Sequence, residues 1–188
     1  MIRAFVAIPL PDDIRAALVA LQARLQVGRV LPPENLHLTL VFLGEVPDPL
    51  LEEVHLALSG VHAAPLTLRL AGLDMFGGAR PRSIHARVVP DPALDHLQAR
   101  VAQAARTAGV QVEARRFVPH VTLAYVNAAR TGRARLARAV AGGAAFAAGP
   151  FQVHGFALYR SDLGRGPARH AELAQYPLSA SPNPSDPA

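Results

Sequence analysis

The sequence predicts an α+β fold with two similar lobes, each an antiparallel sheet backed by helices, and a cleft between them. Hydrophobic residues make up 51% of the chain and charged residues 18%, which is typical of a globular protein with a proper core. Strand and helix patterns alternate without a long linker. The order strand, helix, strand, helix, strand occurs about twice, which indicates an internal pseudo-repeat whose halves meet near residue 80 or 90.

In the first half, we expect strands at residues 2–8, 35–43 and 66–70. A first helix opens at Pro11-Asp12-Asp13, because acidic residues stabilise the positive end of a helix dipole. The strand over residues 35–43 should end at Gly44, and Asp48-Pro49 begins a second helix. The strand over residues 66–70 leads into a glycine- and arginine-rich loop, Gly72 to Arg82.

The second half repeats this pattern. We expect strands at residues 83–89 and 117–126, near 150–160, and at 171–178. Asp91-Pro92 begins a helix that continues to about Ala108, and a short helix follows from Thr131 to Ala141. Residues 1–178 should form one bilobal domain. The proline- and serine-rich residues 179–188 should form a disordered tail.

Composition excludes several classes of chemistry. The chain has no cysteine, which removes disulfides, thiol nucleophiles and thiolate zinc sites. All 19 of its basic residues are arginine, so there is no lysine for a P-loop or for adenylylation. The net charge of +5 is compatible with a phosphate-bearing substrate. No apolar run is long enough to cross a bilayer, and the short apolar N-terminus indicates a cytoplasmic protein without a signal peptide.

A paired motif carries the functional signal. His37-Leu38-Thr39-Leu40 occurs in the first half and His120-Val121-Thr122-Leu123 in the second, both inside apolar strands. Because side chains alternate along a strand, each histidine should share a face with its threonine. In the first strand we expect Leu38, Leu40 and Phe42 on the opposite, buried face. Neither motif contains an acidic residue, so we expect no metal site.

The motifs and their flanks resemble the two-histidine (2H) phosphoesterase superfamily, and within it the RNA 2′,3′-cyclic phosphodiesterase family, often called 2′-5′ RNA ligases. Four segments carry the resemblance: residues 3–8 (Arg-Ala-Phe-Val-Ala-Ile), His37 to Gly44, Arg116 to Leu123, and residues 158–161 (Leu-Tyr-Arg-Ser).

The resemblance implies metal-independent hydrolysis of RNA 2′,3′-cyclic phosphate ends, with no cofactor. RNA with such ends, tRNA halves among them, would be the partner, with no obligate protein partner. Two histidines can act as acid and base if one is protonated and the other neutral. The residues alone do not say which is which. The resemblance implies that His37 donates a proton to the ribose 3′-oxygen and that His120 accepts one from water, which leaves a 2′-phosphate. Any RNA joining would be the reversal of ring opening.

Further residues are candidates for binding. Thr39 and Thr122 would donate hydrogen bonds to the phosphoryl oxygens. The predicted substrate-binding residues are Arg116, Arg82, Tyr125 and Phe5. The chain departs from the family pattern at two positions: Tyr125 stands where the family often has an arginine, and His170 where it often has a tyrosine. The remaining histidines, His85 among them, have no threonine partner and are interpreted as structural.

Two alternatives remain open. The chain could act on another substrate of the same superfamily, such as ADP-ribose cyclic phosphate, a 2′-5′ oligonucleotide or a U6-type RNA end. It could also be a non-catalytic module that binds RNA ends through its imidazoles. Product analysis separates the first alternative, and turnover separates the second.

Overall fold

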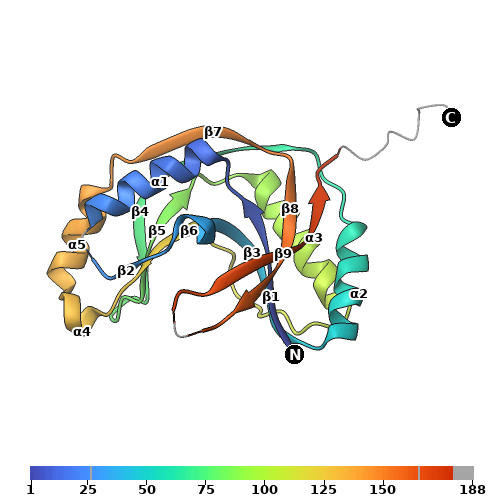
Figure 1. Cartoon of the computed structure of the whole chain (residues 1–188). Coiled ribbons are helices and arrows are strands. Elements are labelled where there is room, and N and C mark those ends of the chain that lie inside the picture. Colours follow the sequence, from blue (N-terminus) through green and yellow to red (C-terminus); the bar gives the residue numbers. More distant parts are fainter. Residues whose placement is uncertain (26, 165, 180–188) are drawn as a thin grey trace.

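The structure, a computed structural model, describes residues 1–25, 27–164 and 166–179, and has the predicted α+β class (Figure 1). Its strands are β1 (Ile2–Pro9), β2 (Arg29–Val30), β3 (His37–Val46), β4 (Leu66–Phe76), β5 (Ser83–Val88), β6 (His120–Tyr125), β7 (Ala147–Val153), β8 (Gly155–Asp162) and β9 (Arg169–Pro177). Its helices are α1 (Asp12–Leu25), α2 (Asp48–Ser59), α3 (Pro92–Thr107), α4 (Ala128–Thr131) and α5 (Arg133–Gly142), with a 3₁₀ turn, Pro33–Asn35. No helix of the described residues is long and apolar enough to span a membrane.

All main strands belong to one antiparallel sheet in the order β7-β4-β5-β6-β3-β1-β8-β9, with β2 added beside β6. The sheet consists of two four-stranded halves, which meet where β3 lies next to β6. Within the described residues, the ladder between these two strands is a single pair, Leu38 with Val121. Both side chains are fully buried. The two motif strands therefore form the seam of the sheet.

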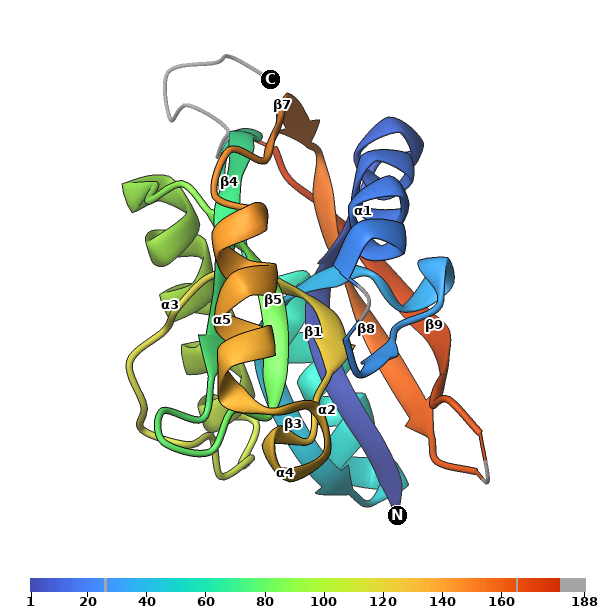
Figure 2. The same ribbon diagram turned by 90° about the vertical axis from the view of Figure 1, so that its left-hand side faces the viewer.

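Helices α1 and α3 each pack on the half of the sheet to which the strand before them does not belong. Strand β1 belongs to the β3 half, but α1, which follows it, packs against β6 and β7 of the other half. Strand β5 belongs to the β6 half, but α3, which follows it, packs against β3. Helix α2 lies beside α3 and contacts β9, while α5 lies over β4 (Figure 2). Each half is thus covered in part by a helix that follows a strand of the other.

Both motif strands contain a β-bulge at the same place. Val6 pairs with Val41 and Ala7 with Thr39, which leaves Leu40 as an extra residue in β3. In β6, Ile84 pairs with Ala124 and His85 with Thr122, which leaves Leu123 as the extra residue. A bulge residue lies outside the regular ladder, so its polar backbone groups need other partners.

Two glutamines supply such partners, and the backbone N–H of Leu31 is a second donor to the Leu123 carbonyl, at 2.9 Å. Gln22 of α1 donates from Nε2 to the Leu123 carbonyl at 2.8 Å and to the Leu31 carbonyl at 2.9 Å. Gln98 of α3 donates to the Leu40 carbonyl at 3.4 Å. Gln22 is buried, with 6% of its surface exposed. The exchanged helices therefore hold the motif strands by side-chain hydrogen bonds as well as by packing.

Most expected elements are confirmed. The helix start at Asp91 is a true cap, because its side chain accepts hydrogen bonds from the backbone of Ala93 and Leu94. Strand β3 does not end at Gly44: that glycine adopts a φ of +75° and the strand continues to Val46.

Three other boundaries differ from the expectation. Strand β4 runs through Gly72 to Phe76, where a loop was expected. Residues 117–119 precede β6 and do not belong to it. The strand expected near residues 150–160 is in fact two strands, β7 and β8.

The division of the chain into one bilobal domain and a disordered tail stays a prediction. Residues 180–188 of that tail lie outside the described residues.

Replacing Gln22 by alanine should lower the free energy of unfolding by about 2 kcal/mol, because the buried carbonyl of Leu31 and the bulge carbonyl each lose a donor. Urea denaturation measures this loss. The matched control is Gln103→Ala on the exposed face of α3, which should change stability by less than about 0.5 kcal/mol. Equal stabilities of the two variants would show that the bulge does not depend on Gln22.

Candidate active site

The seam places the four motif residues together. Because Leu38 pairs with Val121 in antiparallel register, a step of one residue sets His37 opposite Thr122 and Thr39 opposite His120. All four are partly exposed, whereas Leu38 and Val121, each between the histidine and the threonine of its motif, are buried. The imidazoles also lie close enough for the charge of His120 to lower the pKa of His37. Each histidine thus has the threonine of the other motif across the seam.

The backbone orients both rings in the same way. Nδ1 of His120 lies 2.7 Å from the carbonyl oxygen of Val118, two residues earlier. A carbonyl can only accept, so Nδ1 carries the hydrogen and Nε2 has no hydrogen in the neutral ring. His37 forms a hydrogen bond with the backbone of Asn35, also two residues earlier. The neutral His120 ring can therefore accept a proton at Nε2.

Aromatic rings surround His37. Phe5 stacks on it with a centroid distance of 4.8 Å and an interplanar angle of 25°. His170 meets it edge-on at 5.4 Å, and Tyr159 lies at 6.3 Å. The Tyr159 hydroxyl donates to Glu172 at 3.4 Å. This packing limits the rotation of the His37 ring and removes water from it.

His120 has a related setting on β6. Phe76 meets its ring edge-on at 4.6 Å, and His85 lies at 5.1 Å with an interplanar angle of 64°. His85 itself stacks on Phe76 at 4.1 Å. Each motif histidine therefore packs against one phenylalanine and one further histidine.

Burial lowers the pKa of both motif histidines. For His37, burial followed by the charge of His170 lowers the pKa from 6.5 to about 4, although the hydrogen bond with Asn35 opposes the shift. For His120, burial lowers the pKa, the hydrogen bond to Val118 raises it, and Arg115 lowers it again. Both imidazoles are thus neutral near pH 7.

The neighbouring histidines are neutral there too. Burial, followed by the charge of His120, lowers the pKa of His85 to about 4, and burial lowers that of His170.

The bulges change which aromatic side chains share a face with the motif histidines. Phe42 was expected on the buried face with Leu38 and Leu40, but 52% of its surface is exposed. The reason is the extra residue in β3, which shifts the alternation by one and turns Phe42 to the face of His37. Tyr125 takes the equivalent position in β6, with 58% of its surface exposed. Each motif strand therefore has one exposed aromatic side chain on the face of its histidine.

Phe5 was predicted to bind substrate, but its ring is buried. Only 3% of its surface is exposed, and its ring contacts His37, Phe42, Tyr159 and His170. Such a covered ring supports the histidine and leaves no face for a base.

The arginines occupy three different positions. Arg115, from the segment before β6, has its guanidinium carbon 5.8 Å from the centre of the Phe42 ring of β3, and its charge lowers the pKa of His120. Arg116 instead lines a pocket beside β5. Arg82 is exposed at the start of β5, where its carbonyl accepts from the backbone of Val126. Of the three, Arg115 is the one whose charge acts on a motif histidine.

Sequence reasoning missed the role of β5. Its residues Ser83, His85 and Arg87 alternate with buried apolar residues, which was a signal that they share one face. Arg87 pairs directly with His120, and His85 with Thr122. His85 was interpreted as structural because it lacks a threonine partner, yet it contacts a motif histidine.

No group of three histidine, aspartate or glutamate side chains within the described residues has the arrangement of a metal site.

Comparison with known proteins agrees with this geometry. A sequence model of the 2′-5′ RNA ligase superfamily matches residues 10–165. The chain is 35% identical to the RNA 2′,3′-cyclic phosphodiesterase of Thermus thermophilus over 86% of this chain and 82% of that protein. It is 30% identical to the RNA 2′,3′-cyclic phosphodiesterase of Geobacillus stearothermophilus over 95% of this chain, which spans 58% of that longer protein.

Solved structures show the same fold. Escherichia coli LigT complexed with 3′-AMP superposes with a TM-score of 0.75 and 26% identity, covering 95% of this chain and 98% of that one. TT0787 of Thermus thermophilus superposes with a TM-score of 0.78 and 28% identity over the same shares. The family match contains both His-x-Thr motifs and spans most of the sequence, so this chain belongs to the 2′-5′ RNA ligase superfamily.

Proposed function

We propose that this protein hydrolyses RNA 2′,3′-cyclic phosphate ends to a 2′-phosphate by metal-independent acid–base catalysis. The observation that carries the proposal is the seam: two imidazoles lie on its two sides, each opposite a threonine, and each is held by a backbone hydrogen bond. Opening of the cyclic phosphate needs a base on the attacking water and an acid on the departing ribose oxygen, on opposite sides of phosphorus. The names of the relatives support this substrate class.

His120 is assigned as the base. Its Nδ1–H is held by Val118, so the neutral ring presents Nε2 as an acceptor for the proton of water. The burial that lowers its pKa keeps the ring neutral near pH 7. As the water oxygen bonds to phosphorus, the imidazolium that forms is stabilised by the Val118 carbonyl.

His37 is assigned as the acid, which donates its proton to the ribose 3′-oxygen as the bond from phosphorus to that oxygen breaks. Its pKa of about 4 makes it neutral in the empty cleft at pH 7. A phosphate anion bound beside the ring favours the imidazolium, because an opposite charge raises the pKa of a histidine. Substrate binding would therefore raise the pKa of His37 and favour its protonated form. His170 and Phe5 would hold the ring in position.

Neutral donors and aromatic surfaces complete the site. The hydroxyls of Thr39 and Thr122 would donate to the non-bridging oxygens, where negative charge must be stabilised. Phe42 and Tyr125 would offer ring faces to bases, since exposed aromatics stack on single-stranded RNA. Arg115, over Phe42, would add positive charge at the same side. Substrate contacts of Arg82, action on tRNA halves and a cytoplasmic location remain predictions.

Turnover of a nucleoside 2′,3′-cyclic phosphate should continue in excess EDTA without added nucleotide, and the product should be the 2′-phosphate. Phosphorus NMR or chromatography against both isomers identifies it. The His37→Ala/His120→Ala double variant, purified identically, controls for contaminating nucleases. Loss of turnover in EDTA with rescue by zinc or manganese would contradict the metal-free scheme. Binding of labelled RNA ends without turnover would instead indicate a non-catalytic module.

Replacing either His37 or His120 by alanine should reduce kcat roughly 100- to 10,000-fold, the usual effect of a positioned acid or base. A phosphodiester with a p-nitrophenolate leaving group separates the roles, because such a leaving group needs little protonation. On that substrate His37→Ala should recover in part, while His120→Ala should stay slow. Recovery of His120→Ala alone would reverse the two roles. Thr39→Val and Thr122→Val should show smaller losses.

The pH dependence of kcat/KM should be bell-shaped with its optimum below pH 6.5. Catalysis needs one protonated and one neutral imidazole, and both pKa values are lowered from 6.5, that of His37 to about 4. The singly protonated pair of the free enzyme is therefore most abundant below pH 6.5, and the fraction of it that carries the proton on His37 follows the same pH dependence. The optimum of kcat should lie higher, because bound phosphate favours the imidazolium. An optimum of kcat/KM above pH 7 would contradict the lowered values.

A further inference from the structure

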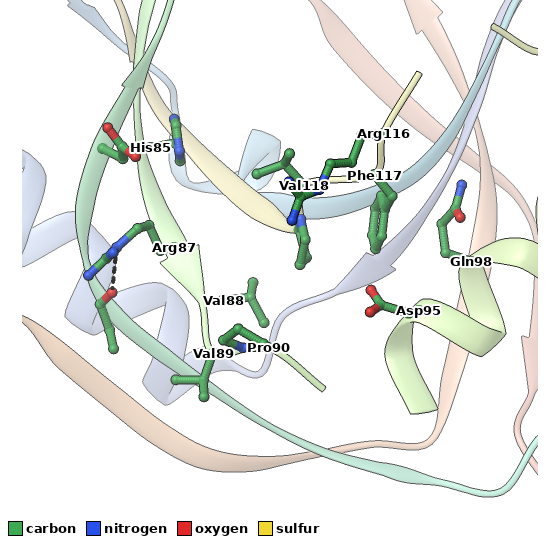
Figure 3. A pocket seen from close by; sticks show the side chains of 13 residues that line it. His85, Arg87, Val88, Val89, Pro90, Asp95, Gln98, Arg116, Phe117 and Val118 are labelled. Atoms are coloured by element: carbon green, nitrogen blue, oxygen red, sulfur yellow. Dashed lines mark hydrogen bonds between the residues drawn. The ribbon is translucent and has the colours of Figure 1, made fainter. Parts of the chain in front are cut away.

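A pocket of about 520 Å³ lies beside the cleft on the β5 side, within the range of volumes that hold small ligands, roughly 300–1,000 Å³. Residues from β4, β5, the start of α3 and the segment before β6 line it (Figure 3). It adjoins the catalytic residues directly: His85 is in its wall and contacts His120, and Arg87 is the cross-strand partner of His120.

Arg87 is held in position at one side of this pocket. Its Nε donates to the Ala71 carbonyl at 3.2 Å, an interaction drawn in Figure 3. Gly72 lies below the guanidinium with a φ of +70°, and a Cβ there would come within 2.8 Å of Nη2. Within the described residues Arg87 forms no ion pair. A cation that is fixed in this way and lacks an acidic partner is suited to an anionic ligand.

Arg116 reaches the pocket from the opposite side, next to Phe117 and Val118 (Figure 3). Apolar residues also line the pocket, Val89 and Pro90 among them. Asp95 and Gln98 of α3 add polar groups at the α3 side. The two arginines suit a phosphate, and the apolar residues suit the face of a base. The polar groups of α3 suit the hydrogen-bonding edge of that base.

From this geometry we propose that the pocket binds the nucleotide that precedes the terminal cyclic phosphate, a substrate class that rests on the function proposed above. Its phosphate lies between Arg87 and Arg116, and its base packs on the wall that contains Phe117 and Pro119. Arg87 is the cross-strand neighbour of His120, which would contact the terminal phosphate. The preceding phosphate of an RNA chain is only one nucleotide away, so it can reach Arg87. Asp74 and Asp95 repel a free polyphosphate, whereas the amino groups of a base or a ribose hydroxyl can donate to them.

The test compares adenylyl-adenosine 2′,3′-cyclic phosphate with adenosine 2′,3′-cyclic phosphate. The native enzyme should have a kcat/KM roughly tenfold or more higher on the dinucleotide, expressed mainly in KM, the size expected for a charge-assisted contact. Arg87→Gln and Arg116→Gln should each bring this ratio toward one. Gly72→Ala should do the same without removing a charge, because its Cβ displaces the guanidinium. Arg24→Gln, at an exposed position near the end of α1, should leave the ratio unchanged.

Binding affinity is measured separately from turnover, so that the test of the subsite does not depend on the proposed reaction. Calorimetry should show that the native protein binds adenylyl-adenosine 2′-phosphate more tightly than adenosine 2′-phosphate, with the difference lost in Arg87→Gln. Equal affinities, or equal losses on both ligands in Arg87→Gln and Arg116→Gln, would overturn the subsite even if turnover is normal. Absent turnover with a preserved affinity difference would overturn the proposed reaction and support the subsite. Thermal melting verifies that each variant is folded.

Discussion

The pairing of Leu38 with Val121 is the contact on which the geometry of the motif residues depends. It is a single pair, but it joins two four-stranded halves of a sheet and lies between the histidines and threonines of the two motifs. Because it is antiparallel, it matches the histidine of each motif with the threonine of the other. A slip of one residue would turn the histidines to the buried face, so the full burial of both side chains fixes the register.

Much of the fold could be predicted from local patterns. Alternation along the motif strands placed each histidine with its threonine, and the cap at Asp91 marked the start of α3. The orientation of Phe42 could not be predicted in this way. It depends on an extra residue in β3 that appears only when that strand pairs with β1, and on Gln98 of α3, which satisfies the freed carbonyl. Both partners are distant in sequence, and a simple period of two does not reveal them.

The same distinction holds for the site. The paired motif predicts His37 and His120 as site residues because the repeat occurs in the sequence itself. His85 and Arg87 have no such mark: they acquire a position beside His120 through the pairing of β5 with β6. The pKa shifts of the histidines could not be predicted from the sequence either. The lowered pKa of His37 arises from burial and from His170, which comes from the last strand.

The exchange of helices between the halves restricts how the protein can move. Many enzymes with a central cleft open by rotation of two bodies about a hinge, and the seam between β3 and β6 would be the natural hinge here. Such a rotation would pull α1 away from β6 and β7, and α3 away from β3, because each helix is tethered by its preceding strand to the opposite half. The apolar surface exposed would oppose that motion. The distance between the imidazoles should therefore stay nearly constant, and the substrate proposed above would meet a site that is already formed before it binds.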